Sequence, residues 1–297
     1  MDTTSAPAGS IVVGVDGSAS GGRALGWAVD QALAEKRPLT LVHAVSPAGA
    51  VWMDQAGMDH RLGLEAMRTS AQQLLESVRA DVTERAPSVE VHEVLRVADP
   101  RDLLLELSEK AAMVVVGSRG RGPLRSLLLG SVGVAVTRHA SCPVVVHRPG
   151  HPGLVRNGVL VGADGSPGSL LTLEFAYRMA SLRQLPLTVL HCSWDVLRTT
   201  GTPELVAASA AAVEEERLLL AESMAGLGER YPDVRVRTEL ARGLADVALT
   251  TAGERMDLIV VGAHHGGVAA EILFGSVASS VLEHATSPAA VVPVGLP

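Results

Sequence analysis

The chain repeats itself over about half of its length. Residues 11–18, IVVGVDGS, return as VLVGADGS at 159–166, and residues 38–43, PLTLVH, return as PLTVLH at 186–191. Both returns lie 148 positions further along a chain of 297 residues. One long shift of this kind is typical of two similar domains in tandem and argues against a solenoid of short repeats.

Each repeat is long enough to form a domain of its own. A domain of about 150 residues buries roughly 68–70% of the surface that its unfolded chain exposes. The chain is 47% hydrophobic but only 2% aromatic, so the cores must be aliphatic. We expect one domain over residues 1–149 and a second over 156–297, with the proline- and glycine-containing segment 148–157 as the linker.

Short apolar segments alternate with amphipathic ones in both halves. Strands that are apolar throughout are typical of parallel sheets covered by helices on both faces. We therefore predict an α/β fold in which each half is a doubly wound, five-stranded parallel sheet. The predicted strands are about 11–16, 39–45, 89–96, 112–117 and 143–147, then about 158–163, 187–192, 234–240, 257–262 and 289–294. The predicted helices are about 18–36, 61–85, 99–110 and 131–139, with a long helix at about 204–230 in the second half.

The last strand of each half would lie at a sheet edge, so we expect these two strands to pair with each other or with a partner chain.

A glycine-rich loop follows the fourth predicted strand of the first half. Gly117 and Gly120 open this loop, and the pair Gly130-Ser131 closes it. In doubly wound sheets, ligands bind beyond the carboxyl ends of the strands, where the strand order reverses. Bare amides at a loop and at a helix start attract phosphate, and the three arginines of this loop suit a compact polyphosphate. Asp16, at the end of the first strand, can accept hydrogen bonds from a ribose hydroxyl or an adenine amino group.

Charge and composition exclude several classes of protein. The net charge of −7 argues against a nucleic-acid partner, because binding to a phosphate backbone depends on clustered lysines and arginines. The sequence has neither a signal-peptide pattern nor the roughly 20 consecutive apolar residues of a membrane helix. We expect a soluble, cytoplasmic protein without a membrane partner. Cys142 and Cys192 are then predicted to be small buried side chains and not a disulfide.

Absent motifs narrow the chemistry further. The chain has no Walker phosphate loop, no Gly-x-Gly-x-x-Gly after the first strand and no Gly-x-Ser-x-Gly nucleophile elbow. A Walker-type NTPase, a dinucleotide dehydrogenase and an α/β-hydrolase are therefore disfavoured. We assign no catalytic residue.

These features together resemble a family. The sequence is similar to universal stress proteins of the tandem, two-domain kind found in actinobacteria. The nucleotide motif of that family is Gly, two residues, Gly, nine residues, Gly, then Ser or Thr, and the segment from Gly117 to Ser131 matches every position. The resemblance covers nearly the whole chain and implies a Rossmann-like fold of the adenine-nucleotide α-hydrolase type. It implies ATP as the ligand, with or without Mg²⁺.

The resemblance also implies which residues of the first half form the site. Gly14 and Asp16 would flank the adenosine, and Ala44 would offer its main chain to the base. The glycine loop would wrap the phosphates, and Ser131 and Val132 would complete the site at a helix N-terminus. The implied set is Gly14, Asp16, Ala44, Gly117, Ser118, Arg119, Gly120, Arg121, Gly122, Gly130, Ser131 and Val132.

The second half departs from the motif at one position. His265 stands where the spacing requires the second glycine, and a glycine follows one place later. If that position requires a left-handed backbone, a Cβ there costs about 1–2 kcal/mol, and the loop also lacks the arginines. We therefore expect a weaker or pH-sensitive second site. Its implied residues are Gly162, Asp164, Gly262, Ala263, His264, His265, Gly266, Gly267, Gly275, Ser276 and Val277.

Several of these residues also have simpler interpretations. His264 and His265 lack a third ligand at useful spacing, so loop histidines are favoured over a metal site. His43 and His191 end apolar strands and are expected to be satisfied histidines of the core or rim. Asp16 could instead cap the following helix, as could its counterpart in the second half, and this role is compatible with ligand binding.

Two classes of function remain open. The favoured one is a regulatory protein that holds ATP, hydrolyses it slowly at most, and associates with a second copy or a regulatory partner according to nucleotide occupancy. The alternative is an enzyme of the adenine-nucleotide α-hydrolase group that releases AMP. That group carries a Ser-Gly-Gly-x-Asp-Ser loop after its first strand, whereas residues 16–20 of this chain read DGSAS.

Overall fold

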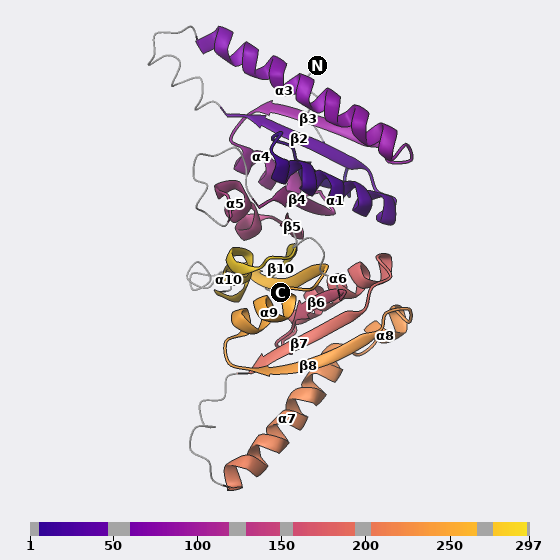
Figure 1. Ribbon diagram of the computed structural model, residues 1–297, viewed down its shortest axis with the longest axis vertical. Coiled ribbons are helices and arrows are strands. Elements are labelled where there is room, and N and C mark those ends of the chain that lie inside the picture. The colour runs from indigo at the N-terminus through magenta and orange to yellow at the C-terminus, as the bar shows by residue number, and fades with distance from the viewer. Residues whose placement is uncertain are drawn as a thin grey trace. The chain divides into compact units, whose positions relative to one another are not determined.

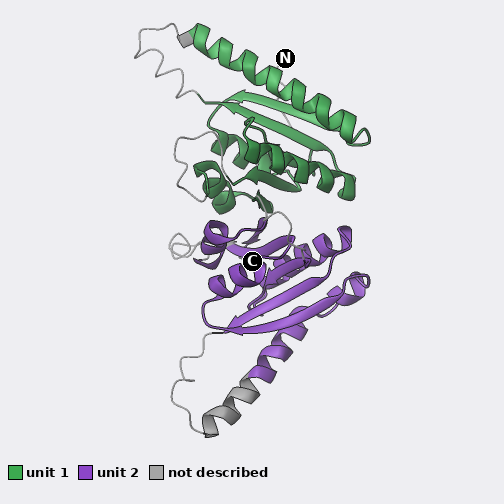
Figure 2. Ribbon diagram, in the orientation of Figure 1, with its two compact units in different colours: residues 1–148 green, residues 149–297 purple. Residues whose placement is uncertain are grey.

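The chain forms two compact units, Met1–Arg148 and Pro149–Pro297 (Figure 1; Figure 2). A computed structural model describes residues 6–46, 60–118, 129–148, 157–193, 203–265 and 276–295. Each unit is an α/β fold with its own parallel sheet, as the sequence predicts. Within these residues, no helix combines the length and the hydrophobicity needed to cross a membrane.

Unit 1 is a five-stranded sheet with helices between the strands. Its strands follow the order β3-β2-β1-β4-β5, and all pairs are parallel. The elements are β1 (Ile11–Gly14), α1 (Ala19–Glu35), β2 (Leu39–Val45), α3 (His60–Arg85), β3 (Val91–Val97), α4 (Pro100–Ser108), β4 (Met113–Gly117), α5 (Ser131–His139) and β5 (Val144–His147).

Local signals in the sequence explain the helix boundaries of unit 1. Ser18 caps α1 by accepting a hydrogen bond from the amide of Gly21 at 3.0 Å, and Asp99 caps α4 with Pro100 in its first turn. Lys36 ends α1 in a left-handed conformation, φ 52°. The helices predicted to start at about residues 18 and 99 begin one residue later, at Ala19 and Pro100.

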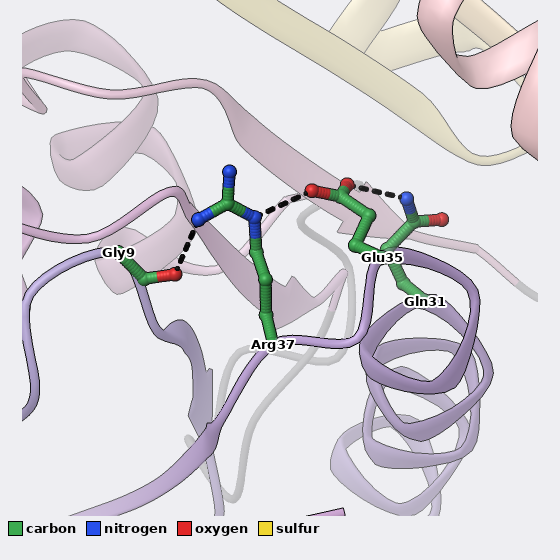
Figure 3. Close-up of polar contacts among 4 residues, drawn as sticks. All are labelled: Gly9, Gln31, Glu35 and Arg37. Atoms are coloured by element: carbon green, nitrogen blue, oxygen red, sulfur yellow. Dashed lines mark hydrogen bonds and ion pairs between the residues drawn. The ribbon is translucent and has the colours of Figure 1, made fainter.

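The amino-terminal edge of unit 1 is held by a polar network around the end of α1 (Figure 3). Arg37 donates to Glu35 at 2.8 Å and to the carbonyl of Gly9 at 3.0 Å, and Gln31 donates to the other oxygen of Glu35 at 2.6 Å. Gln31 is fully buried, and such a group must be hydrogen-bonded to be tolerated. The network ties α1 to the segment before β1, at the opposite edge of the sheet from the candidate site.

Unit 2 repeats the topology of unit 1. Its strand order is β8-β7-β6-β9-β10, again all parallel. The elements are β6 (Val159–Gly162), α6 (Ser169–Leu182), β7 (Leu187–Ser193), α7 (Pro203–Ser223), α8 (Leu227–Arg230), β8 (Val236–Arg242), α9 (Ala245–Gly253), β9 (Leu258–His265), α10 (Ser276–His284) and β10 (Ala289–Gly295).

The sheets form the cores of both units. In β1, β4, β6 and β9 the central side chains are aliphatic and almost inaccessible to solvent, as the scarcity of aromatic residues requires. Beside β1, the buried hydroxyl of Thr40 in β2 donates to the buried hydroxyl of Ser10 at 3.1 Å. β5 and β10 each end the strand order of their unit, which confirms their predicted edge positions. The pairing expected of these two strands stays a prediction.

Two elements of unit 2 differ from the sequence prediction by more than two residues. The long helix expected at 204–230 is broken into α7 and α8, because Gly226 adopts φ +80°, a left-handed conformation that ends a helix. The strand expected to end at Gly262 continues to His265, since β10 pairs with it as far as Gly295.

The two cysteines differ in environment, and neither forms a disulfide. Cys142 is buried as predicted, whereas Cys192 is half-buried. Burial raises the pKa of the Cys142 thiol from 9.0 to about 12, which lowers its thiolate fraction at neutral pH by about a thousandfold. We therefore expect alkylation of Cys142 in the native protein to be at least about a hundredfold slower than in the urea-unfolded chain, measured by mass spectrometry. Equal rates in the two states would contradict this.

Candidate functional site

The candidate site of unit 1 lies where the strand order reverses. β1 has β2 on one side and β4 on the other, so the chain leaves the ends of β1 and β4 in opposite directions. In parallel sheets, ligands bind at the carboxyl edge of the strands where the order reverses in this way. Gly14 and Gly117, both in the predicted set, are the last residues of these two strands.

Gly117 allows β4 to approach the first turn of α1 closely. A Cβ at this position would lie 2.8 Å from the carbonyl carbon of Ser20 and 3.0 Å from the amide nitrogen of Gly21. Both distances are to backbone atoms, which cannot swing aside as a flexible side chain can. Glycine at position 117 is therefore a packing requirement, whether or not a ligand binds.

Asp16 lies at the same helix start. Its carboxylate accepts a hydrogen bond from the amide of Ser18 at 2.9 Å. Ser18 is the residue that caps α1, so Asp16 forms an Asx turn before the cap and is not the cap itself. A Cβ on Gly21 would lie 2.5 Å from the carboxylate oxygen of Asp16, which places this carboxylate directly against α1. Asp16 remains half-exposed.

The end of β4 and the start of α5 meet at one point. The amide of Ser118 donates to the carbonyl of His147 at 3.1 Å, and the amide of Gly130 donates to the carbonyl of Ser118 at 3.0 Å. Ser118 is buried, with its hydroxyl 3.5 Å from that of Ser20. The entry and the exit of the glycine loop are thus joined by a main-chain hydrogen bond.

The N-terminus of α5 has no side-chain cap. Gly130 occupies the N-cap position with φ −69° and ψ 156°, and it supplies no side-chain acceptor to the first turn. The amides that open a helix have no acceptor within it, so those of Ser131 and Val132 find none in α5, and a helix start of this kind favours an anion. Ser131 is exposed and Val132 is half-exposed. Leu129 packs against Gly133 and fixes the entry of the chain into the helix.

Ala44 and His43 lie near the end of β2, next to β1. Ala44 is half-exposed, as a residue that presents its main chain to a ligand must be. The Nδ1 atom of His43 lies 2.6 Å from the carbonyl oxygen of Val15, and that of His191 lies 2.9 Å from the carbonyl oxygen of Ala163. The prediction that both histidines are satisfied is confirmed.

Part of the predicted set lies outside the described residues. This applies to Arg119, Gly120, Arg121 and Gly122 in the first half and to Gly266, Gly267 and Gly275 in the second. The described part of each candidate site consists of strand ends and helix starts.

The carboxylate of Asp164 in unit 2 accepts more hydrogen bonds from described residues than that of Asp16 in unit 1. The carboxylate of Asp164 accepts from the amide of Ser166 at 2.9 Å and from the hydroxyl of Ser169. Burial alone would raise the pKa of Asp164, but the hydrogen bonds from these serines outweigh burial and lower the pKa below its usual value. In unit 1 the position that matches Ser169 is occupied by Gly21. It lies next to the carboxylate of Asp16 but has no hydroxyl to donate.

A side chain of α7 lies over the first loop of unit 2. Gly165, with φ +79°, packs so closely against Leu219 that a Cβ would lie 2.3 Å from a methyl carbon of that leucine. Gly162 is also crowded, since a Cβ there would lie 3.0 Å from Leu249. At Gly14, the matching position of unit 1, the nearest atoms would be 3.9 Å away.

The backbone at the predicted second glycine loop is a strand. Gly262, Ala263, His264 and His265 belong to β9, and the last of these pairs with Gly295. The interpretation of the two histidines as loop residues is therefore wrong. Among the described non-glycine residues only Lys36 and Gln184 have positive φ, so position 265 does not require a left-handed backbone and the cost considered for a Cβ there does not arise.

The start of α10 matches the start of α5. α10 begins at Ser276, which is exposed, and Val277 follows in its first turn, half-exposed.

Across the part of the chain that the structure describes, no three His, Cys, Asp or Glu side chains are grouped to hold a metal ion.

Ser20 and Gly21 also belong to the candidate site, although neither is in the set predicted from the sequence. They form the surface against which Gly117 packs, and Ser20 also meets Ser118. The run SASGG at positions 18–22 was the available signal, because consecutive small residues at a helix start permit close approach of a neighbouring strand.

Comparison with known proteins agrees with this architecture. The model of the universal stress protein family matches twice, at residues 8–148 and 156–293. A universal stress protein of Mycolicibacterium smegmatis is 36% identical over 289 residues, covering 95% of this chain and 96% of its own. One from Mycobacterium tuberculosis is 34% identical over 293 residues, covering 94% of each chain.

Solved structures share the fold over the same length. A universal stress protein from Archaeoglobus fulgidus superposes with a TM-score of 0.67 at 18% identity, covering 96% of each chain. A functionally unknown protein from Pseudomonas aeruginosa gives 0.64 at 19% identity, covering 97% of this chain and 93% of its own. With both halves matched by one family model and relatives aligned from end to end, the chain belongs to the universal stress protein family.

Proposed function

We propose that unit 1 binds ATP at the carboxyl edge of β1 and β4. The observation that carries this proposal is the uncapped N-terminus of α5, which begins directly beside the end of β4. Such a helix end combines free amides with a positive dipole and therefore favours phosphate. The family's nucleotide motif, matched in full between Gly117 and Ser131, supports the same ligand.

The adenosine would lie between the ends of β1 and β2. Asp16 is half-exposed there and, among the described residues, accepts one hydrogen bond, from the amide of Ser18, so its carboxylate has further lone pairs that can accept from ribose hydroxyls. The main chain at Ala44 would contact the base. Mg²⁺ would be held mainly by the phosphates and water, since the described ends of β1 and β4 offer it a single carboxylate.

Unit 2 is proposed to bind nucleotide more weakly. The reasons are the serine contacts of Asp164, the leucine over Gly165 and the extension of β9, and not the backbone cost at His265 that the sequence suggested. We expect about one tightly bound nucleotide per chain.

The proposed role is regulatory. ATP would be held and turned over slowly at most, and its occupancy would alter association with a second copy or with a regulatory partner. A ligand can shift such an equilibrium only as far as its affinities for the two states differ.

The experiment is to identify the nucleotide carried by the purified protein. Mass spectrometry of material released by denaturation is expected to find ATP, and calorimetric titration of stripped protein is expected to find about one tight site per chain. A stripped protein that binds no adenine nucleotide would overturn the proposal. Rapid turnover to AMP and pyrophosphate would replace it with the α-hydrolase alternative.

A further inference from the structure

Among the described residues of unit 2, no strand pairs with the outer side of β8. β8 ends the strand order of its unit and is its outermost strand (Figure 1). Its first half is solvent-exposed: Val236 is 38% exposed, and the side chains of Arg237 and Glu239 are 61% and 41% exposed. An edge strand of this kind can accept another strand through its unpaired backbone groups.

The ladder with β7 determines which residues of β8 face outward. The amide of Leu187 donates to the carbonyl of Arg235, and the amide of Gly243 donates to the carbonyl of Ser193. Since backbone groups alternate along a strand, the odd-numbered residues of β8 point their amides and carbonyls toward β7. Those of Val236, Thr238 and Leu240 therefore point outward.

The sequence of β8 is complementary to itself in the antiparallel direction. If two copies pair about Thr238, the two Thr238 residues lie opposite each other as a hydrogen-bonded pair, which their outward backbone groups allow. Arg237 then lies opposite Glu239 of the second copy, and the reverse pair completes two ion pairs on one face. Val236 lies opposite Leu240 of the second copy on the other face. Charge, apolar contact and backbone direction all agree in this single register.

The present contacts of Arg237 and Glu239 are compatible with new ion pairs to a second copy. Arg237 lies 3.2 Å from Glu239 in its own strand, and it also donates to Thr188 at 2.9 Å. Exposed ion pairs contribute little to stability, so sharing Glu239 with a second arginine costs little. In the paired state each arginine would have a carboxylate directly across the strands.

The equivalent edge of unit 1 lacks this complementarity. At the two ends of β3, the amide of Leu39 in β2 donates to the carbonyl of Glu90, and the amide of Ala98 donates to the carbonyl of Val45 in β2. The even-numbered residues therefore point their amides and carbonyls toward β2, and those of the odd-numbered residues of β3 point outward. Pairing about Glu93 would place two carboxylates opposite each other, which is unfavourable. α3 also packs against both β2 and β3.

We propose that β8 is a docking surface for a second copy of this chain, joined by antiparallel pairing about Thr238. Pairing about Thr238 joins residues 236–240 of the two strands, a small interface, so the dimer is reversible and depends on concentration. The charges at positions 237 and 239 oppose pairing in other registers and with unrelated strands.

Charge reversal tests the register directly. Sedimentation velocity of the full chain over a concentration series is expected to show dimerisation. Arg237→Glu or Glu239→Arg alone should lower the association constant by about tenfold or more, because each places like charges opposite one another. The double variant, and an equimolar mixture of the two single variants, should both associate again. Glu90→Arg, an equal charge change at an exposed site of unit 1, is the control and should have no effect.

A backbone variant tests the same register without changing charge. Thr238→Pro removes an amide that points outward and leaves the β7 ladder its donors, whereas Thr238→Val keeps the amide. The proline variant should lose association and the valine variant should keep it, with equal far-ultraviolet circular dichroism. A wild-type chain that shows no association, or one whose association is unaffected by the single charge reversals, would overturn the proposal.

Discussion

Replacing Ser131 by proline is expected to weaken ATP binding by about 10- to 100-fold. Proline removes the first amide of α5, and a hydrogen bond from an amide to a charged group contributes about 1.5–3 kcal/mol. The fold should tolerate the change, because proline is favoured at the first position of a helix. Gly130, with φ −69° and ψ 156°, already has the extended conformation that a residue before proline requires. Calorimetric titration of stripped protein measures the effect.

Two matched variants distinguish loss of the Ser131 amide from loss of its hydroxyl and from a proline at the start of α10. Ser131→Ala keeps the amide and removes the hydroxyl, so its affinity should fall by less than that of the proline variant. Ser276→Pro makes the same change at α10 and should leave the tight site unaffected. If Ser131→Pro binds ATP as the wild type does, the start of α5 is not the phosphate site.

Replacing Gly117 by alanine is expected to destabilise unit 1 by about 2 kcal/mol. The new methyl group would meet backbone atoms of Ser20 and Gly21 at 3.0 Å or less, so β4 or α1 must move. The buried thiol of Cys142 reports opening of unit 1. Its native alkylation rate should rise by about 30-fold, the factor that corresponds to 2 kcal/mol.

Glycines in matching places provide the controls for this variant. Gly14→Ala adds a methyl group whose nearest neighbours lie 3.9 Å away, so the rate at Cys142 should change little. Gly262→Ala, in unit 2, meets the side chain of Thr172 at 2.7 Å and should also leave Cys142 protected. An unchanged rate in the Gly117 variant would show that β4 and α1 are not held together as described.

The elements whose limits depend on local sequence were predicted well. β2 at 39–45 and α5 at 131–139 were predicted to the residue, since proline, glycine and serine mark where they begin. The two-domain repeat and the α/β class followed from the long internal shift and from the apolar strands. Strands that are buried on both faces must be apolar throughout, so this pattern is visible in the sequence alone.

The boundaries that depend on a partner strand or on one backbone angle were not predictable. β9 extends to His265 because β10 offers hydrogen bonds that far, which nothing within VVGAHH indicates. The helix break at Gly226 depends on a left-handed glycine in a segment that otherwise favours a helix. In both cases tertiary context overrides local preference.

Three residues of the predicted set have the positions in the fold that the sequence suggested. Asp16, chosen because it ends the predicted first strand, lies two residues after β1, whereas Gly117 and Ser131, chosen from motif spacing, end β4 and begin α5. Their role in binding stays a prediction. The serine that holds Asp164 and the leucine over Gly165 were missed. Such contacts join residues far apart in sequence or depend on a turn geometry that spacing does not specify.

The two imidazole rings give each unit its own spectroscopic reporter. A carbonyl oxygen can only accept, so His43 and His191 must carry their proton on Nδ1 when neutral, leaving Nε2 as the unprotonated nitrogen. This is the less common neutral tautomer in solution, and nitrogen-15 resonances distinguish it from the other one. Ordering or loosening of either carboxyl edge could thus be followed separately in the intact chain, without attaching a probe.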